Sequence, residues 1–356
     1  MVIGFPSAIM LVMGGMVGVG VFVNPAVVAR NLHDPWLALA AWAVGGVVAL
    51  LGAFVYAELA ARMPVTGGEY VYLRSAYGPL VGFLFGWTTL LVVQAGGMAA
   101  VAIVFAKNIE VLAGGIAPEA VVVVGVLAVL AAINCLGVTL GNGVQGALGA
   151  IKIVAIAALI VVGLVVAAPG PAVAATDVGA VSPDTLKLFG AAMIPVVFSY
   201  GGWQTSNYVA GEVVDAHRNL GRALVAGVLA VIALYLLVNL ACLRTLGVEA
   251  LGRTLTPTSD VLSKVAGPTG ARLAAGAIAL SAIAFLSQST LTGPRVYFAM
   301  ARDGLFFRQA AAIGATSRAP GVAIVLQAAW TSLLALSGSY EQILSYVIAM
   351  NFLFFG

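Results

Sequence analysis

The sequence predicts an all-α protein that crosses a lipid bilayer many times. Of its 356 residues, 62% are hydrophobic and only 8% are charged, and the mean hydropathy is +1.11. A soluble domain carries about 25% charged residues. This chain has too few charged side chains to cover the surface of a soluble 36.0 kDa protein. The apolar residues form long blocks that suit spanning helices, not the short alternating runs of an outer-membrane barrel. Composition thus argues against a cytosolic enzyme, and the absence of a basic run argues against a nucleic-acid-binding protein.

Ten apolar blocks predict ten spanning helices, because about 20 apolar residues are needed to cross a bilayer. The expected helices cover residues 4–28, 36–61, 79–106, 119–140, 146–168, 185–214, 220–243, 272–301, 320–336 and 340–356. Polar connectors are expected at residues 62–79, 169–184 and 254–267, and the last could form a short helix lying on the membrane face. The sequence begins and ends inside apolar blocks without a signal peptide, so we expect the natural protein to be longer.

Two of these blocks contain residues that interrupt a helix. The first block has four glycines between residues 14 and 20, and the sixth has Pro195 ahead of the cluster at residues 199–202. Glycine costs about 1 kcal/mol relative to alanine within a helix, and proline costs more. Taken alone, Gly14-x-x-x-Gly18 also fits a helix-packing motif. The second interruption, five helices later, favours two five-helix halves, residues 1–168 and 185–356, each with a broken first helix.

Broken helices at matching positions of two halves indicate a transporter substrate site. The second part of each broken helix begins with free N–H groups, which suit a carboxylate. The first part ends in free carbonyl groups, which suit an ammonium. This combination predicts a zwitterionic α-amino acid as the substrate. No acidic residue lies at the middle of an apolar block, since Glu58 and Glu212 lie toward helix ends, so we expect a neutral substrate side chain.

Four motifs in order resemble those of the amino acid–polyamine–organocation superfamily, and within it the branch of L-type amino acid transporters and bacterial amino acid permeases. The motifs are GVGVFVNP at residues 18–25, GGEYVYLRSAYGP at 67–79, FSYGGWQTSNYVAGEV at 198–213 and TGPRVYFAMARDGLF at 292–306. The resemblance implies a leucine-transporter-like inverted repeat of five plus five helices, followed in the family by two helices that are missing here. It also implies sodium-independent uptake or exchange of amino acids.

The resemblance also assigns roles to individual residues. It implies that the substrate meets helix 1 at Met16, Gly18, Val19 and Gly20. From helix 6 it implies contacts from Phe198, Ser199 and Gly201, with Phe198 acting as a gate, and with Trp203 in a gating position. Gln204 stands where the family varies a polar side chain that tunes substrate size.

Several positions depart from the family pattern. Val19 replaces a serine, which removes a hydroxyl group from the expected carboxylate site but leaves the backbone N–H. His217 and Gly221 replace two prolines after helix 6, Ser287 replaces a common asparagine in helix 8, and Phe307 replaces a proline. These departures affect the identity of the substrate more than the fold.

Lys152 lies about a turn and a half into the fifth predicted helix. On sequence alone it fits a lysine that snorkels to the membrane interface. The resemblance implies a different role, in which its ammonium occupies the place of the sodium ion of sodium-coupled relatives and holds the unwound carbonyls of helix 1. An ionisable group within a membrane span is a functional candidate.

Other polar residues have a structural alternative beside a functional one. Tyr235 either directs its hydroxyl at the unwound helix 1 or packs as an aromatic ring. Five polar residues in apolar blocks are expected to form interhelical hydrogen bonds rather than to bind substrate: Gln94, Asn134, Asn207, Asn239 and Gln288. Arginines and acids at one membrane face form either a gate or lipid anchors: Arg74, Arg218, Arg295, Arg302, Glu69, Glu212, Asp215 and Asp303.

The prediction is therefore a multi-pass transporter of neutral L-α-amino acids in a plasma membrane, with a slight basic excess favouring a cytoplasmic amino terminus. Content rich in alanine, valine and glycine hints at a bacterial inner membrane. A proton-coupled permease or antiporter of cationic amino acids or polyamines is the alternative. A polytopic enzyme and a channel are disfavoured, because no polar catalytic cluster and no ring of charges is evident. We expect no cofactor, no metal and no nucleic-acid partner, and leave an accessory subunit or oligomer open.

Overall fold

Eighteen helical segments make up the described part of the chain, in a computed structural model. The described residues are 3–350 apart from 116, 171–182, 315–316, 339–341, 344–345 and 348–349. Within them the structure contains no named β-strand, and the one isolated β-bridge pairs Ile3 with Val213. The all-α polytopic fold class predicted from the sequence is confirmed.

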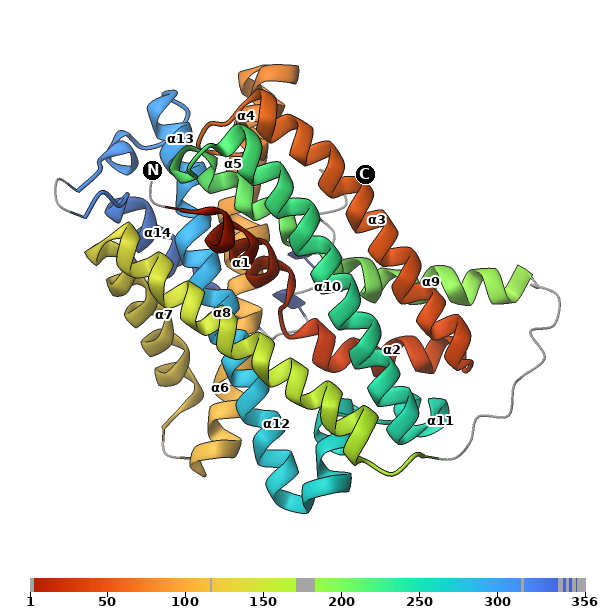
Figure 1. Cartoon of the computed structure of the whole chain (residues 1–356). Coiled ribbons are helices and arrows are strands. Elements are labelled where there is room, and N and C mark those ends of the chain that lie inside the picture. The colour runs from red at the N-terminus through yellow and green to blue at the C-terminus, as the bar shows by residue number, and fades with distance from the viewer. Residues whose placement is uncertain are drawn as a thin grey trace.

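The first half of the chain forms nine helices and two π-helical segments (Figure 1). They are α1 (Phe5–Met16), α2 (Gly20–Leu32), α3 (Pro35–Arg62), α4 (Glu69–Tyr77), α5 (Pro79–Thr88), η1 (Thr89–Val93), α6 (Gln94–Ala113), α7 (Glu119–Leu136), α8 (Val138–Val161), η2 (Val162–Val166) and α9 (Pro183–Tyr200). The start of α3 shows how a boundary is set: Asp34 accepts a hydrogen bond from the Leu37 N–H at 2.8 Å, and Pro35 occupies the first turn.

The second half continues with longer helices. They are η3 (Trp203–Glu212), α10 (Ala216–Leu246), α11 (Val248–Arg253), α12 (Pro257–Thr292), α13 (Pro294–Arg302), η4 (Arg308–Ala311) and α14 (Gly321–Ser337). Seven helical stretches of the described chain are long and apolar enough to span a membrane, and the bent pair of α1 and α2 makes an eighth. α14 is a shorter apolar helix. The tenth predicted helix lies mostly outside the described residues, and the five-plus-five repeat stays a prediction.

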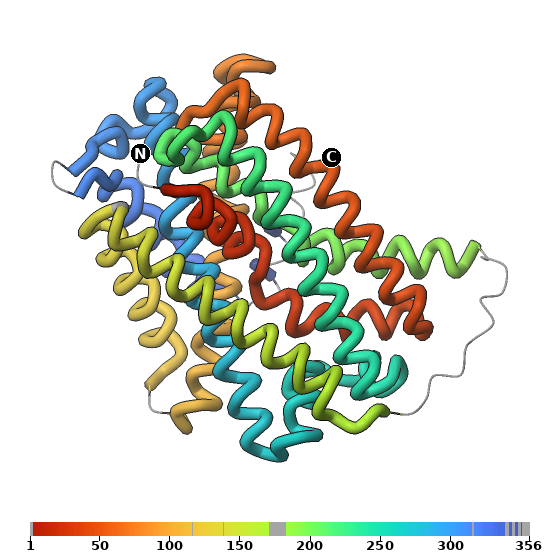
Figure 2. The backbone as a smooth tube through the Cα atoms, viewed as in Figure 1, coloured from red at the N-terminus to blue at the C-terminus, as the bar shows by residue number. Residues whose placement is uncertain are grey.

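The centre of the molecule is occupied by α1 and α2. Figure 2 shows the backbone of α1 between those of α10 and α8, and α1 contacts α8, α10 and α12. The largest hydrophobic cluster joins side chains from α1, α2, α3, α8, α9 and α10. A smaller cluster holds α4 and α5 against α13. The interrupted helix 1 is thus packed inside the helix bundle.

One predicted turn lies at a different position in the structure. The turn between the fourth and fifth spans lies at Gly137 and not at residues 141–145, so Leu140 belongs to α8. α12 starts at Pro257 but is interrupted at Gly267, where φ is 54° and ψ is −137°. A separate helix therefore occupies the 254–267 connector, and the eighth span begins at Pro268, close to the predicted residue 272. The 62–79 connector also contains a helix, α4, and the 169–184 connector lies mostly outside the described residues.

Candidate functional site

Helix 1 is broken at residues 17–19. α1 ends at Met16 and α2 begins at Gly20, and the two helices are bent by 45° relative to each other. Val17 has φ −77° and ψ 86°, which is not helical, and no side chain caps the start of α2. Carbonyl groups at the end of α1 and N–H groups at the start of α2 are therefore exposed to the interior of the bundle, as the glycine pattern predicts.

Helix 6 is broken directly after Tyr200. α9 ends there, and the chain continues through Gly201 and Gly202 into the 3₁₀-helical η3. Gly202 has φ 103°, a left-handed conformation that favours glycine. Its N–H donates to the Oε1 atom of Gln204 at 3.0 Å, so the side chain of Gln204 caps the break. Both helix breaks predicted from the sequence are confirmed.

The two breaks lie against each other through their backbones. A Cβ atom at Gly15 would come within 2.5 Å of the Gly202 carbonyl oxygen, and a Cβ atom at Gly202 would come within 2.2 Å of the Gly15 carbonyl oxygen. No real Cβ atom tolerates these distances. The glycines are therefore required for the close approach of the broken helices, and not only for their unwinding.

Lys152 of α8 reaches the carbonyl groups of the helix 1 break. Its ammonium donates to the Val17 carbonyl at 2.6 Å and to the Gly14 carbonyl at 3.3 Å, and the residue is buried. These bonds satisfy carbonyls that the end of α1 leaves unpaired. The geometry favours the ammonium–carbonyl contact over a snorkelling lysine, which would extend toward the membrane interface.

Tyr235 of α10 connects the two breaks. Its hydroxyl lies 2.8 Å from the Met16 carbonyl oxygen and 3.0 Å from the Ser199 carbonyl oxygen. Its ring lies 5.5 Å from that of Trp42 and 5.0 Å from that of Tyr200, measured between centroids. Tyr235 therefore does both things expected of it: its hydroxyl contacts the unwound helix 1, and its ring packs against other aromatic rings.

Polar side chains also pair around the outer parts of the breaks. The amide of Asn24 in α2 donates to the Ser199 hydroxyl at 2.6 Å and lies 3.1 Å from the Pro195 carbonyl oxygen. The Ser199 hydroxyl in turn donates to the Pro195 carbonyl. Ser281 of α12 donates to the Gly18 carbonyl at 3.1 Å. The contact between Asn24 and Ser199 ties α2 to α9, so the two outer half-helices are joined directly.

The predicted substrate residues differ in exposure. Met16 and Ser199 are buried, whereas Phe198 is 39% exposed. Gly18, Val19 and Gly20 at the break are half-buried, and Gly201, beside the second break, is exposed.

Trp203, predicted to act as a gate, packs on α3. Its ring centroid is 4.9 Å from that of Tyr56, and it lies where a Cβ atom of Gly52 would be. Its contacts therefore join the second break to α3. The substrate and gating roles assigned to these residues stay predictions.

The start of α1 is held to the end of η3. The Ile3 N–H donates to the Glu212 carbonyl at 3.1 Å, and the Val214 N–H donates to the Ile3 carbonyl at 2.9 Å. Ile3 is fully buried. The inner halves of both broken helices are thus joined at one side of the bundle, where Figure 1 also shows α4 and α13.

Two of the expected gate ion pairs form at this side. Arg295, which is buried, pairs with Glu212 at 2.9 Å and also donates to the Leu291 carbonyl. Arg74 pairs with Asp303 at 3.0 Å. Arg302 instead lies over the Phe298 ring. The pairs connect η3 to α13 and α4 to the turn after α13.

Glu69 of α4 is buried and is bound by tyrosines instead of an arginine. Tyr56 of α3 donates to its carboxylate at 2.6 Å, and Tyr208 of η3 donates at 2.8 Å. Burial raises the pKa of the Glu69 carboxyl to about 7, although the two phenol hydroxyls lower the pKa. This carboxyl therefore connects three elements at the inner side and titrates near neutral pH.

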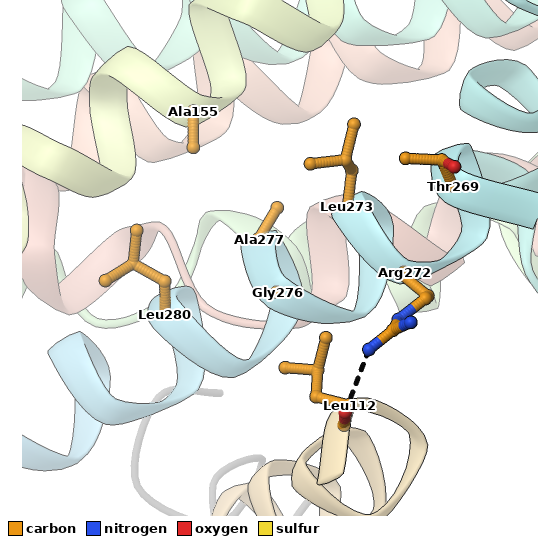
Figure 3. Close-up of a pocket in the computed structure, with 8 residues that line it drawn as sticks. All are labelled: Leu112, Ala155, Thr269, Arg272, Leu273, Gly276, Ala277 and Leu280. Atoms are coloured by element: carbon orange, nitrogen blue, oxygen red, sulfur yellow. Dashed lines mark hydrogen bonds between the residues drawn. The ribbon is translucent and has the colours of Figure 1, made fainter. Parts of the chain in front are cut away.

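A pocket of about 520 Å³ lies elsewhere, between α6, α8 and the outer part of α12. Figure 3 shows Arg272 donating to the Leu112 carbonyl at 3.3 Å across this pocket. Apart from Arg272 and Thr269 its lining is apolar, and none of the residues at the breaks belongs to it. We therefore place the candidate site at the breaks.

Sequence reasoning missed Asn24, Ser281 and Trp42. Asn24 could have been noticed, because an asparagine before Pro25 within an apolar helix is a polar residue without a local partner. Ser281 and Trp42 carried no such signal. Their roles depend on which helices lie side by side, and one sequence does not specify that.

Comparison with known proteins places the chain among amino acid transport proteins. A family model described as amino acid permease matches residues 3–356. The chain is 32% identical to the serine/threonine exchanger SteT of Bacillus subtilis, an alignment that covers 99% of this chain and 80% of that protein. It is 30% identical to the mouse large neutral amino acids transporter small subunit 2, and this alignment covers 99% of this chain and 68% of that protein. It is 29% identical to the mouse b(0,+)-type amino acid transporter 1, with 99% and 74% covered.

Proposed function

Because the chain belongs to the amino acid permease family, its general activity is amino acid transport, and we propose that it carries neutral L-α-amino acids by sodium-independent alternating access. The main support for this proposal is that the breaks in helices 1 and 6 lie against each other. The protein is a multi-pass protein of the plasma membrane.

The zwitterion follows from the groups that the breaks present. The uncapped start of α2 offers N–H groups to a carboxylate, and the end of the first part of helix 6 offers carbonyl groups to an ammonium. The two breaks are close to each other, because the Tyr235 hydroxyl donates to a carbonyl group of each. An α-amino acid carries its two charges close enough together to use both.

A neutral side chain follows from the charges around the breaks. Among the described residues, Lys152 is the charged side chain that forms hydrogen bonds with the helix 1 break, and it carries a positive charge. A cationic substrate side chain would lie near a like charge and without a carboxylate partner. The relatives named as exchanger of serine and threonine and as transporter of large neutral amino acids support this class.

Sodium independence follows from Lys152. Its ammonium already donates hydrogen bonds to the carbonyl groups of Gly14 and Val17, which are the kind of oxygen ligands that a metal cation would need. A resident amine at this position removes the requirement for a bound sodium ion.

The test is uptake by purified protein in proteoliposomes. Labelled serine, alanine, leucine, arginine and putrescine are compared, with and without internal unlabelled substrate, a sodium gradient and a pH gradient. We expect a neutral amino acid to enter, unaffected by replacing sodium with potassium. Uptake of arginine or putrescine alone would favour the cationic alternative, and dependence on a pH gradient would favour proton coupling. Failure of every amino acid to enter would contradict the proposal.

A further inference from the structure

Two buried glutamines next to α1 have side-chain atoms without a hydrogen-bond partner in the described chain. Gln145 of α8 is 1% exposed, and neither its Nε2 nor its Oε1 atom has a partner in the described chain. Gln288 of α12 is also 1% exposed. Its Nε2 donates to the Thr205 hydroxyl at 2.8 Å, but its Oε1 has no such partner. Buried polar groups are nearly always satisfied in folded proteins, so these atoms require an explanation.

Both glutamine side chains pack against the end of α1, at Gly14 and Gly15. A Cβ atom at Gly14 would be 2.4 Å from Gln145 Nε2 and 3.6 Å from Gln288 Cγ, and a Cβ atom at Gly15 would be 3.3 Å from Gln288 Nε2. We call Gln145, Gln288 and Thr205 the inner polar layer. It is covered by α1 and bordered by α8, α12 and η3, which all contact α1.

The inner polar layer lies on the path from the breaks toward the inner side. Gln145 is two helical turns before Lys152, and Gln288 is two turns after Ser281, and both Lys152 and Ser281 bind the helix 1 break. Two turns of α-helix correspond to about 10 Å. The backbones of Gln145 and Gln288 therefore lie nearer the inner side than those of Lys152 and Ser281, while their side chains reach Gly14 and Gly15 at the inner end of the breaks.

We propose that the inner polar layer is a second, transient binding site for the zwitterion of an amino acid that moves between the breaks and the inner side. The inference rests on the proposed function. Amide N–H groups bind a carboxylate and amide oxygens bind an ammonium, so two glutamines supply both without a charged side chain. Displacement of α1 exposes them. The layer binds the part that all α-amino acids share, so it serves every substrate alike.

The energetics favour this role. While α1 covers the glutamines, their unpaired atoms destabilise the closed inner side, because each buried group has lost its water without gaining a partner. When α1 moves, water or substrate satisfies them. The layer thus lowers the cost of opening toward the inner side and receives the substrate there.

The test compares the two faces of the membrane. Half-saturating concentrations of a transported amino acid are measured in right-side-out and inside-out membrane vesicles for the wild type and Gln145→Met. We expect the value at the inner face to rise about 10-fold or more, as for the loss of one hydrogen bond to a charged group of the ligand. The value at the outer face stays the same or falls, because removing the unpaired atoms also stabilises the closed inner side. Gln145→Asn, which keeps the amide, restores part of the difference.

Gln327→Met is the matched control, because Gln327 is equally buried and also has an unpaired Oε1, but lies on α14 away from α1. It should leave the ratio between the two faces unchanged. The proposal would be overturned if Gln145→Met changed the half-saturating concentration equally at both faces, or changed only the maximal rate. Either result would show that water alone occupies the layer. Melting temperature identifies misfolded variants. Absence of transport by the wild type would instead contradict the proposed function.

Discussion

At the scale of single residues, Lys152 combines a structural and a functional role. An ammonium buried inside a membrane protein is costly unless it is paired, and here its partners are backbone carbonyls that exist only because helix 1 unwinds. The lysine and the break therefore stabilise each other. A chain with a continuous helix 1 would leave Lys152 unpaired.

Lys152→Ala is expected to reduce amino acid uptake at least 10-fold. The change removes two charge-assisted hydrogen bonds, each contributing about 1.5–3 kcal/mol, from the carbonyls of Gly14 and Val17, and leaves Val17 with only the 3.5 Å contact from the Ser281 hydroxyl. Uptake into proteoliposomes measures the effect. Lys187→Ala is the control, because the Lys187 side chain is 80% exposed and pairs with the similarly exposed Asp184. Equal uptake by Lys152→Ala and wild type would contradict a functional role for Lys152.

Glu69 makes the docking of α4 depend on pH. Its carboxyl has a pKa of about 7 when it is buried against Tyr56 and Tyr208, compared with 4.5 for the free side chain. The docked state therefore binds a proton more tightly than an undocked state, and docking weakens as the pH rises from about 4.5 through 7. Above that range the carboxylate is charged in both states, and the loss is complete.

Glu69→Gln should remove this dependence. In the wild type we expect the melting temperature to be higher at pH 5.5 than at pH 8, with transport responding over the same range. The variant, which mimics the protonated form, should show a nearly flat profile between these values. A variant profile as steep as that of the wild type would assign the dependence to another group.

At the scale of elements, the sequence was sufficient to locate both helix breaks. Glycine and proline act on the backbone locally, so their clusters predict interruption without knowledge of the neighbours. The contact between Gly15 and Gly202 could not be predicted, since it depends on how two distant segments face each other. The boundary at Gly137 was missed for a related reason: one glycine in an apolar stretch is a weaker signal than the Gly-Asn-Gly at residues 141–143.

Gly202→Ala is expected to abolish transport and lower stability. The new methyl group would collide with the Gly15 carbonyl oxygen, and the left-handed φ of 103° disfavours alanine. Uptake and melting temperature of the purified variant test this. Gly125→Ala in α7 is a control, because a Cβ atom there would meet nothing within 4 Å. Wild-type uptake by Gly202→Ala would show that the breaks do not need their close approach.

At the scale of the whole molecule, the structure is closed at the side where α1 begins. Ile3 pairs with the end of η3, the ion pair of Arg295 and Glu212 fixes η3 to α13, and Glu69 fixes α4 to η3. Alternating access requires these contacts to break together. They were foreseen only in part, because the sequence suggested charges at one face but not the tyrosine partners of Glu69.

Glu212→Gln should destabilise this closed side. Arg295 is buried, and removing its partner leaves an uncompensated charge that can cost about 3–5 kcal/mol. We expect a lower melting temperature and a larger fraction of protein open to the inner side, read from the accessibility of an introduced cysteine near Ile3. Glu58→Gln is the matched control, since its pair with Arg62 is exposed on both sides and surface pairs contribute little. Equal effects of the two variants would contradict a gate at Glu212.

The most direct test of the facing breaks is the binding of matched ligands to purified protein. Titration calorimetry compares a transported amino acid with its amide, which lacks the carboxylate, and with the corresponding carboxylic acid, which lacks the ammonium. We predict saturable binding of the amino acid and a loss of at least 10-fold in affinity for each analogue, because each removes one charged partner of the exposed peptide groups. Equal affinity for all three compounds would contradict recognition of a zwitterion by the broken helices.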